Sequence, residues 1–236
     1  YKRQDFATAS LDFEKYFDNC VVEYARRTLL NEGMDPEIVE LAIHMWINQL
    51  RYVAFAFFVA QDPEKVTTCL PQGDPLSLIT SVLMLKNVVR MVMKDLSKLR
   101  PDVKQCITSY VDDRAIMHKD PEVVALCVKL FFEKSKAIAL VENTDKAEGT
   151  AYSAKKRRQL KENFDKHGLT QLGVKVVDSI KILGCYTTTA KRKKNNVNEE
   201  SRITKAINKI KKIKSLPVPL KLKRLYISTA ALPILN

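Results

Sequence analysis

Two adjacent carboxylates, Asp112 and Asp113, lie between two β-favouring runs of the chain. The run before them is Cys106–Ser109, and the run after them is Ala115–Met117. This arrangement predicts a β-hairpin with the acids at its tip. At a tip both side chains can face one cleft, whereas neighbouring side chains within a strand point to opposite faces.

A third acid, Asp12, ends a strand-like run at Asp5–Leu11. Carboxylates near 4 Å apart repel by roughly 4 kcal/mol at an effective dielectric of 20, so three in one cleft need cations or shared protons. Mg²⁺ prefers oxygen ligands and is often coordinated by both protein carboxylates and substrate phosphates. Two such ions can promote displacement at phosphorus. Nuclease and polymerase chemistry both fit. The alternative is a merely polar turn, because turns are rich in Asp.

A glycine-containing turn, Gln72-Gly73-Asp74, precedes a helix that begins at Pro75. Glycine permits close backbone approach to a ligand, and a helix N-terminus favours anionic groups. An ordinary loop before a helix has the same composition. The position of this turn between Asp12 and the acid pair nevertheless gives an ordered constellation that argues against a merely polar turn.

The net charge of +13 is concentrated near the C-terminus. Residues 181–236 hold 14 Lys and Arg against Glu199 and Glu200, which leaves 26 basic and 25 acidic residues for positions 1–180. A basic segment beside a nearly neutral body favours a polyanionic partner such as nucleic acid. A solvated, lysine-rich tail fits the charge equally well.

The apolar periodicity predicts helices and strands in mixed order. Helices are expected near residues 19–30, 36–50, 75–99, 121–137 and 154–164, and strands near 52–60, 139–141, 172–177 and 180–186. Because the order lacks strict βαβ alternation, the expected class is α+β with an antiparallel sheet. Two basic helices follow Glu199 and are separated by Ser215–Pro219, so we expect a boundary within residues 191–198.

The five cysteines are odd in number and scattered, which favours reduced thiols in an intracellular protein. The three histidines are also dispersed, so no zinc site is expected. No stretch approaches the roughly 20 apolar residues of a membrane span. The best candidate, Leu78–Met93, carries Lys86 and Arg90, and we expect no membrane partner.

Four segments resemble the motifs of reverse transcriptases. Leu11–Asp18, Leu70–Ser77 and Tyr110–Asp113 resemble motifs A, B and C, and Asn143–Gly149 resembles the lysine-bearing motif D. Lys181–Cys185 resembles the Leu-Gly turn of the non-LTR (LINE-type) retrotransposon lineage. The resemblance implies a right-hand polymerase palm at residues 1–190, with helices 19–50 near the fingers, and the basic helical start of a thumb at 191–236.

The resemblance also implies roles for single residues. Asp12 and Asp112 would bind two Mg²⁺ ions, with Mn²⁺ as a possible substitute, assisted by the backbone carbonyl of Phe13. Asp113 would support the site as a ligand or electrostatically. Lys146 would act as a general acid toward pyrophosphate.

Other residues would contact the nucleotide and the nucleic acid. Phe17 matches the aromatic gate that excludes a 2′-hydroxyl, with Tyr16 as the alternative register, and Gln72 and Gly73 would line the incoming nucleotide. Residues expected to contact primer or template are Tyr110, Leu183, Gly184, Lys205, Lys209 and Lys212.

The implied function is an RNA-directed DNA polymerase that joins a primer 3′-hydroxyl to the α-phosphate of a dNTP and serves retrotransposition. The implied partners are an RNA template, a DNA primer, dNTPs and other domains of a longer polyprotein, and the family favours a nuclear location. The fingers segments that ordinarily precede motif A are expected upstream of this chain, and without them the fragment can be inactive.

Two alternatives stay open. An RNA-dependent RNA polymerase is disfavoured by Tyr110–Asp113 and by the bulk of Phe17. A noncatalytic, nucleic-acid-binding or maturase-like relic is disfavoured because Asp12 and the acid pair are all intact, since the loss of even one of these acids would cost a binding protein little.

Overall fold

The computed structural model describes residues 5–231 except positions 53, 56, 57, 60, 63, 66, 67, 183, 184 and 189–193. The chain forms two compact units, one ending at Val177 and one beginning at Asp178. The hairpin at residues 179–188, expected within the palm, therefore belongs to the second unit. The division into a palm at 1–190 and a thumb at 191–236 stays a prediction.

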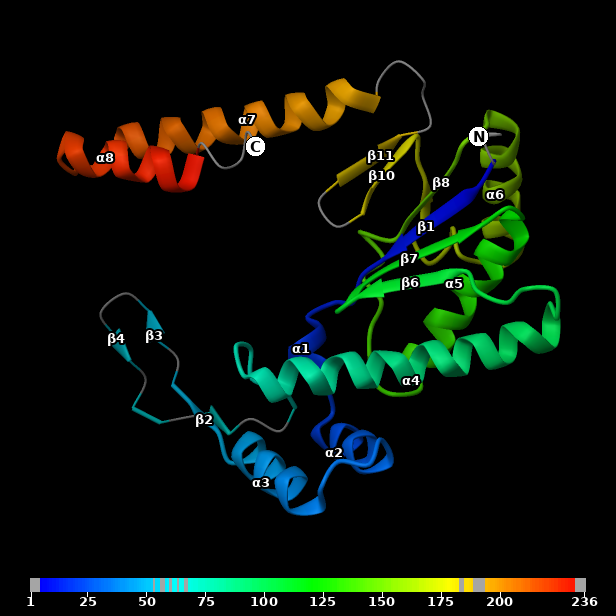
Figure 1. Ribbon diagram of the computed structural model, residues 1–236, viewed down its shortest axis with the longest axis horizontal. Helices are drawn as coiled ribbons and strands as arrows, with labels where there is room; N and C mark the ends of the chain where they lie inside the picture. The colour runs from blue at the N-terminus through cyan, green and yellow to red at the C-terminus, as the bar shows by residue number, and fades with distance from the viewer. Residues whose placement is uncertain are drawn as a thin grey trace. The chain divides into compact units, whose positions relative to one another are not determined.

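A five-stranded sheet with the order β6-β7-β1-β8-β9 forms the centre of the first unit (Figure 1). The strands are β1 (Ala7–Leu11), β6 (Ile107–Tyr110), β7 (Asp113–His118), β8 (Glu148–Ala151) and β9 (Lys175–Val176). The pairs β6-β7, β7-β1 and β1-β8 are antiparallel, whereas β8 and β9 are parallel. The mixed α+β class is confirmed, but the sheet is not wholly antiparallel as expected.

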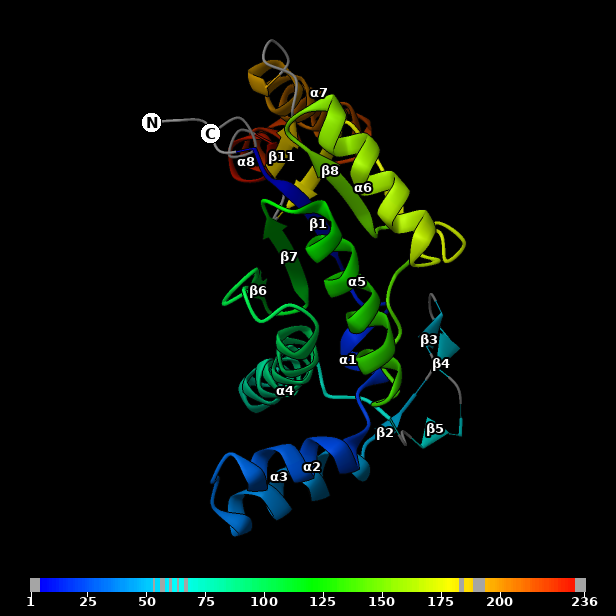
Figure 2. The same cartoon turned by 90° about the vertical axis from the view of Figure 1, so that its right-hand side faces the viewer.

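Helices cover this sheet on one face, where α5 packs on β1 and β7 and α6 packs on β8 (Figure 2). The helices of the first unit are α1 (Tyr16–Asn19), α2 (Val22–Asn31), α3 (Pro36–Ile47), α4 (Pro75–Leu99), α5 (Pro121–Lys136) and α6 (Ala154–Lys166). Side chains of Asp74, Asp120 and Ser153 cap the N-termini of α4, α5 and α6. Such caps satisfy backbone N–H groups that have no partner within the helix.

Strand β8 was not expected from the sequence, because its glycine is unfavourable in strands. A Cβ atom on Gly149 would lie 2.9 Å from the ring of Phe164 in α6. The glycine therefore permits close contact between β8 and the buried face of α6, which also holds Leu160. Tertiary packing overrides local propensity at this position.

Two strand predictions are wrong. Residues 52–60 do not form one strand; the described residues form two-residue strands β2 (Leu50–Arg51), β3 (Ala54–Phe55), β4 (Phe58–Val59) and β5 (Glu64–Lys65), paired as β2-β5 and β3-β4. Residues 139–141 contain no strand. Ala139 has a φ of 61°, and the Leu140 N–H donates to the carbonyl of Ser135 in the last turn of α5. A left-handed residue cannot continue a strand.

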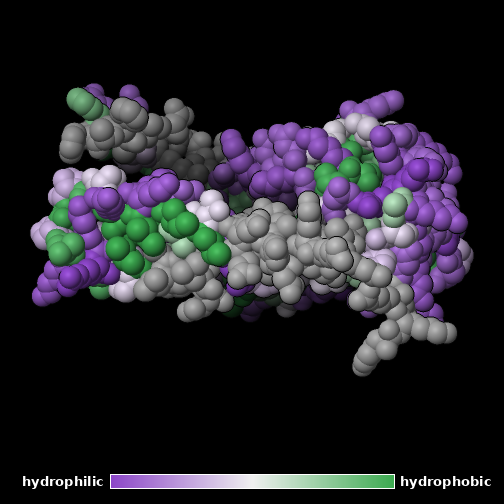
Figure 3. Space-filling model, turned by 90° about the horizontal axis from the view of Figure 1, so that it is seen from above, coloured by the Kyte–Doolittle hydropathy of each residue, from purple (hydrophilic) through white to green (hydrophobic). Residues whose placement is uncertain are grey.

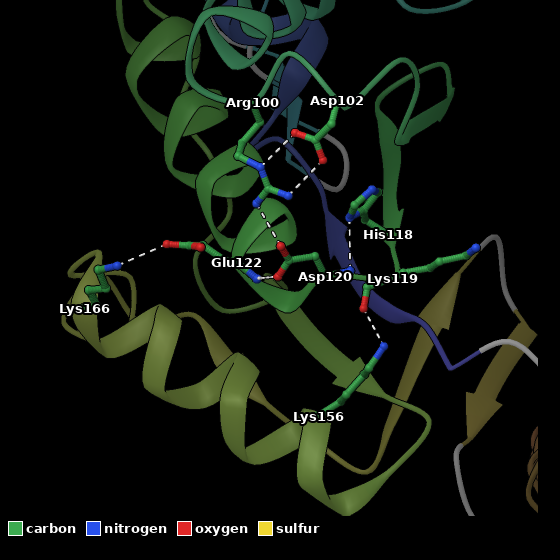
Figure 4. A network of polar contacts seen from close by, with 8 residues as sticks. All are labelled: Arg100, Asp102, His118, Lys119, Asp120, Glu122, Lys156 and Lys166. Carbon is green, nitrogen blue, oxygen red and sulfur yellow. Dashed lines mark hydrogen bonds and ion pairs between the residues drawn. The ribbon is translucent and has the colours of Figure 1, made fainter.

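A polar network ties the end of α4 to the start of α5 and to α6 (Figure 4). We call the following side chains the α5 network: Arg100, Asp102, His118, Asp120, Glu122, Lys156 and Lys166. Arg100 donates to Asp102 at 3.0 Å and to Asp120 at 2.8 Å, while Asp120 caps α5. Each carboxylate drawn in Figure 4 has a cationic partner.

Helix α4 is the one described helix that could cross a membrane by length and composition. Its buried side includes Met84, Val88 and Val92, which belong to the core. Lys86 and Arg90 form ion pairs with Glu32, the residue that directly follows α2. We interpret it as a core helix.

The second unit contains the hairpin β10 (Ser179–Ile182) and β11 (Cys185–Thr188), helices α7 (Lys194–Ser215) and α8 (Leu220–Tyr226), and the π-helical segment η1 (Ile227–Ala231). The strand expected at 180–186 is thus a hairpin. The two basic helices expected after Glu199 are present, although α7 begins earlier, at Lys194.

Candidate active site

The predicted acids meet at one edge of the sheet because of strand register. Leu11 pairs with Arg114 in the antiparallel β1-β7 ladder. The next position along each strand is Asp12 on one side and Asp113 on the other. Asp112 lies in the adjoining hairpin turn.

The hairpin differs from its prediction in one respect. Tyr110 pairs with Asp113, so only Val111 and Asp112 form the turn and Asp113 begins β7. Val111 has a φ of 54°, which is an outlier for a β-branched residue and marks backbone strain of the kind found at functional sites. Tyr110 is 66% exposed beside this turn.

Lys146 joins the same edge from the segment before β8. The β1-β8 pairing ends at Ser10 and Glu148, and Lys146 lies in the turn that precedes β8. Its ammonium donates to Asp12 Oδ2 at 2.5 Å. The pKa of Lys146 is raised by this hydrogen bond first and by the charge of Asp12, with smaller contributions from Asp112 and Asp113. We call Asp12, Asp112, Asp113 and Lys146 the acidic edge.

The carboxylates of the acidic edge repel one another. The pKa of Asp113 is raised by partial desolvation first and then by the charges of Asp112 and Asp12. Within the part of the chain that the structure describes, no three His, Cys, Asp or Glu side chains are grouped to hold a metal ion. The predicted ligands therefore share an edge without forming a ready-made ligand set, and Lys146 supplies positive charge at Asp12.

The donor set fits a hard divalent cation. Carboxylate and carbonyl oxygens are the ligands that Mg²⁺ prefers, and such an ion would relieve the repulsion that raises the pKa of Asp113. Phe13 forms an isolated β-bridge with Glu142. The hydrogen bonds of this bridge join the neighbouring residues, Asp12 to Asn143 and Glu14 to Val141, so they do not use the carbonyl of Phe13. The Lys146 ammonium holds Asp12 Oδ2, so a cation at that oxygen would compete with it.

The Gln72-Gly73 turn is exposed and firmly supported. Gly73 has a φ of 96°, a conformation that favours glycine. Asp74, the next residue, accepts hydrogen bonds from Trp46 Nε1 at 2.9 Å and Ser77 Oγ at 3.0 Å. Burial raises the pKa of Asp74, but these bonds outweigh it and hold the pKa below its usual value.

Phe17 and Tyr16 differ in their surroundings. Tyr16 is 3% exposed, and its hydroxyl donates to the Ser81 carbonyl. Phe17 is half-buried, and its carbonyl accepts from the Leu70 N–H at 2.8 Å, which joins motif A to the segment before the Gln72 turn. Of these two aromatic side chains, Phe17 is thus the more accessible one.

The predicted nucleic-acid contacts lie partly in the second unit. Lys205, Lys209 and Lys212 are exposed on α7 and line, with Asn208, a depression of about 430 Å³. Apolar side chains of α7 and α8 are also exposed, among them Ile203, Ile207, Leu220 and Leu225. Figure 3 shows hydrophobic and hydrophilic residues side by side on this unit. Leu183 and Gly184 lie outside the described residues.

Sequence reasoning missed a buried ion pair beside the acidic edge. Arg114 is 1% exposed and donates to both carboxylate oxygens of Glu142, at 2.7 and 2.8 Å. Ser135 Oγ donates to Glu142 Oε1 at 2.7 Å. The sequence did hold a signal for this ion pair: Arg114, directly after the acid pair, occupies a position of β7 that points into the core.

The family of the chain follows from comparison with known proteins. No curated protein matches the chain closely enough to serve as a relative. Residues 2–187 match the family model described as reverse transcriptase (RNA-dependent DNA polymerase), which covers most of the 236 residues. The three acids, the Gln72-Gly73 turn and Lys146 all lie within the matched range. The chain therefore belongs to the reverse transcriptase (RNA-dependent DNA polymerase) family.

Proposed function

We propose that this chain contains the catalytic palm of an RNA-directed DNA polymerase that uses two Mg²⁺ ions, with Mn²⁺ as a possible substitute. The observation that carries the proposal is the meeting of Asp12, Asp112 and Asp113 at one sheet edge in a member of the reverse transcriptase family. The substrates would be a DNA primer, an RNA template and dNTPs.

In this proposal the carboxylates of Asp12 and Asp112 and the carbonyl of Phe13 hold the ions, and Asp113 adds negative charge. When bound, such ions activate the primer hydroxyl and stabilise the leaving oxygen. Lys146 carries its proton at neutral pH, as an ordinary lysine does, and its hydrogen bond to Asp12 raises its pKa further. Once displaced from Asp12, its ammonium lies at the same edge to protonate pyrophosphate.

The surrounding residues would position the substrates. Half-buried Phe17 would block a 2′-hydroxyl, and the exposed Gln72-Gly73 turn would line the nucleotide. The lysines of α7 would hold the nucleic-acid backbone without reading its sequence.

Primer extension on an RNA template with Mg²⁺ tests the proposal. The assay uses the full natural protein that carries this domain and compares it with Asp112→Asn and with the control Glu162→Gln, an exposed acid on α6. We expect Asp112→Asn to lose several kcal/mol of transition-state stabilisation, which lowers the rate of extension about 10³-fold, and Glu162→Gln to keep the wild-type rate. Equal activity in the wild type and Asp112→Asn would refute the catalytic assignment.

One observation favours a second function, noncatalytic binding of nucleic acid. Asp12 is ion-paired with Lys146, and the described acids do not form a ready-made metal group. Tight binding of a primer and template without any extension would support this reading. Incorporation of ribonucleotides as readily as deoxyribonucleotides would instead favour an RNA polymerase.

The basic helix is tested separately. Replacing Lys205, Lys209 and Lys212 with Gln should weaken binding to all sequences alike. In a plot of the logarithm of the binding constant against the logarithm of the salt concentration, the slope should become less steep by about 2 to 3. A filter-binding series across salt concentrations measures this slope. Loss of binding to one sequence alone would contradict the role.

The proposed biological role is retrotransposition inside the nucleus. It rests on the resemblance of Lys181–Cys185 to non-LTR enzymes. A marked copy of the parent element that carries Asp112→Asn should yield no new insertions in cells, and continued insertion would count against this role.

A further inference from the structure

The three segments that carry the acidic edge are joined beneath it by one buried ion pair. Both partners are nearly inaccessible, with the Arg114 side chain 0% and the Glu142 side chain 2% exposed. A buried pair is seldom the most stable way to fill a core, since apolar residues of similar volume often do as well. The pair therefore needs another explanation, and its contacts offer one.

Arg114 reaches the acid-pair turn directly. Its Nε donates to the backbone carbonyl of Asp112 at 3.2 Å, while its other two nitrogens bind Glu142. The planar guanidinium has donors in a fixed fork, so the two sets of bonds determine one orientation. The bonded carbonyl belongs to the peptide between Asp112 and Asp113, one residue beyond the strained Val111, so Arg114 fixes the end of the turn.

Arg114 also supports the motif that carries Asp12. Its guanidinium carbon lies 3.6 Å from the centre of the Phe13 ring and 5.1 Å from that of Phe131. Stacking of a guanidinium on an aromatic face is favourable and restricts both groups. Phe13 is 3% exposed, so its ring has little room to move.

Glu142 closes the arrangement through its backbone neighbours. The N–H of Asn143 donates to the Asp12 carbonyl and the N–H of Glu14 donates to the Val141 carbonyl, both at 2.9 Å. These bonds hold Phe13 and Glu142 side by side. The main chain at Asp12 is thus linked through Glu142 and Arg114 to the main chain at Asp112.

We propose that Arg114 and Glu142 are positioning residues that set the spacing of the Asp12 and Asp112 main chains for binding of a divalent cation. This inference deepens the proposed function and rests on it for the role of the cation. Arg114 touches no substrate in this scheme and acts through Asp112 and Phe13.

Two variants test the proposal. Arg114→Lys keeps the charge opposite Glu142 but lacks the fork that also reaches Asp112 and stacks on Phe13. The double variant Arg114→Gln with Glu142→Gln removes both buried charges together. The control Leu160→Ala truncates a fully buried side chain of α6 and destabilises the protein without touching this pair.

The first readout is Mn²⁺ binding to the full natural protein, measured by electron paramagnetic resonance without substrates. The second is the Mg²⁺ concentration that gives half-maximal primer extension. Loss of a partner behind a metal ligand typically weakens metal affinity about 10- to 100-fold, and we expect both Arg114 variants to shift both readouts in that range. Leu160→Ala should lower thermal stability and leave both readouts unchanged.

Unchanged Mn²⁺ affinity and Mg²⁺ dependence in folded Arg114 variants would overturn the proposal, as would failure of both variants to fold or absence of Mn²⁺ binding by the wild type. A wild type that binds Mn²⁺ but extends no primer would refute the proposed function alone, because the Mn²⁺ affinities still decide the role of Arg114. A wild type that extends primers while the variants keep its metal dependence would refute the role of Arg114 alone.

Discussion

The acidic edge and the α5 network both gather several charged side chains, but only the network balances them. Arg100 lies between Asp102 and Asp120, and hydrogen bonds from Arg100 help to lower the pKa of both acids against the opposing effect of burial. At the acidic edge three carboxylates face one lysine, and the pKa of Asp113 is raised. We therefore expect the network to stabilise the fold and the unbalanced charge of the edge to cost stability, as functional sites often do.

The buried pair behind the edge should show the largest effect on stability. Arg114→Met leaves the Glu142 carboxylate buried without its charged partner, and we expect the free energy of unfolding to fall by about 3–5 kcal/mol. Arg100→Met breaks pairs that are only partly buried, with the Arg100 side chain 25% exposed, and should cost about 1 kcal/mol or less. Urea denaturation midpoints measure both losses. Equal losses would show that burial does not distinguish the two arginines.

The cap within the α5 network should show a smaller effect. Asp120→Ala removes the bond to the Glu122 N–H, and N-cap losses cost about 1 kcal/mol. Asp102→Ala is the matched control, because Asp102 also binds Arg100 but caps no helix. Thermal melts should show a greater loss for Asp120→Ala. The reverse order would assign the stabilisation to the ion pairs instead.

Neutralising an acid of the edge should show the smallest effect and the opposite sign. Asp113→Asn relieves repulsion from Asp112 and Asp12, so we expect a gain in stability at pH 7 of up to about 0.5 kcal/mol, within the usual range for surface substitutions. Primer extension should fall in the same variant. Calorimetry at matched buffer conditions measures the gain, and a clear loss of stability would contradict the proposed repulsion.

The pH dependence of these variants provides a further contrast. The pKa of Asp113 is higher in the folded than in the unfolded state. Ionisation of Asp113 therefore does not destabilise the fold below the unfolded pKa of about 3.9, and its destabilising effect appears as pH rises from there through the folded pKa. The folded pKa of Asp120 is lowered, so its stabilisation is present above the unfolded value and is lost as pH falls. Melting curves from pH 3 to 7 should show Asp113→Asn gaining, and Asp120→Asn losing, relative to the wild type as pH rises. Parallel trends in the two variants would contradict the difference in charge balance between the acidic edge and the α5 network.

Much of the fold could be predicted from the sequence, and the exceptions have local causes. The long helices that begin at Pro75 and Pro121 follow from their apolar periodicity, and in the structure an Asp cap precedes the Pro of each. Strand β8 was missed because Gly149 is unfavourable in isolation and is explained only by contact with Phe164. The apolar run at 52–60 predicts one strand, whereas the structure has the short paired strands β3 and β4 there, since hydrophobic composition does not reveal where a chain turns back on itself.

The candidate site shows the same division. The sequence by itself determined the order and spacing of Asp12, Gln72-Gly73, the acid pair and Lys146, because these are properties of the linear chain. Only the tertiary structure decided that Asp12 lies opposite Asp113 and forms an ion pair with Lys146, since strand register and side-chain contacts depend on pairing between distant segments. It also decided that Arg114 is buried against Glu142, because burial of a charge becomes tolerable only when folding brings its partner to it.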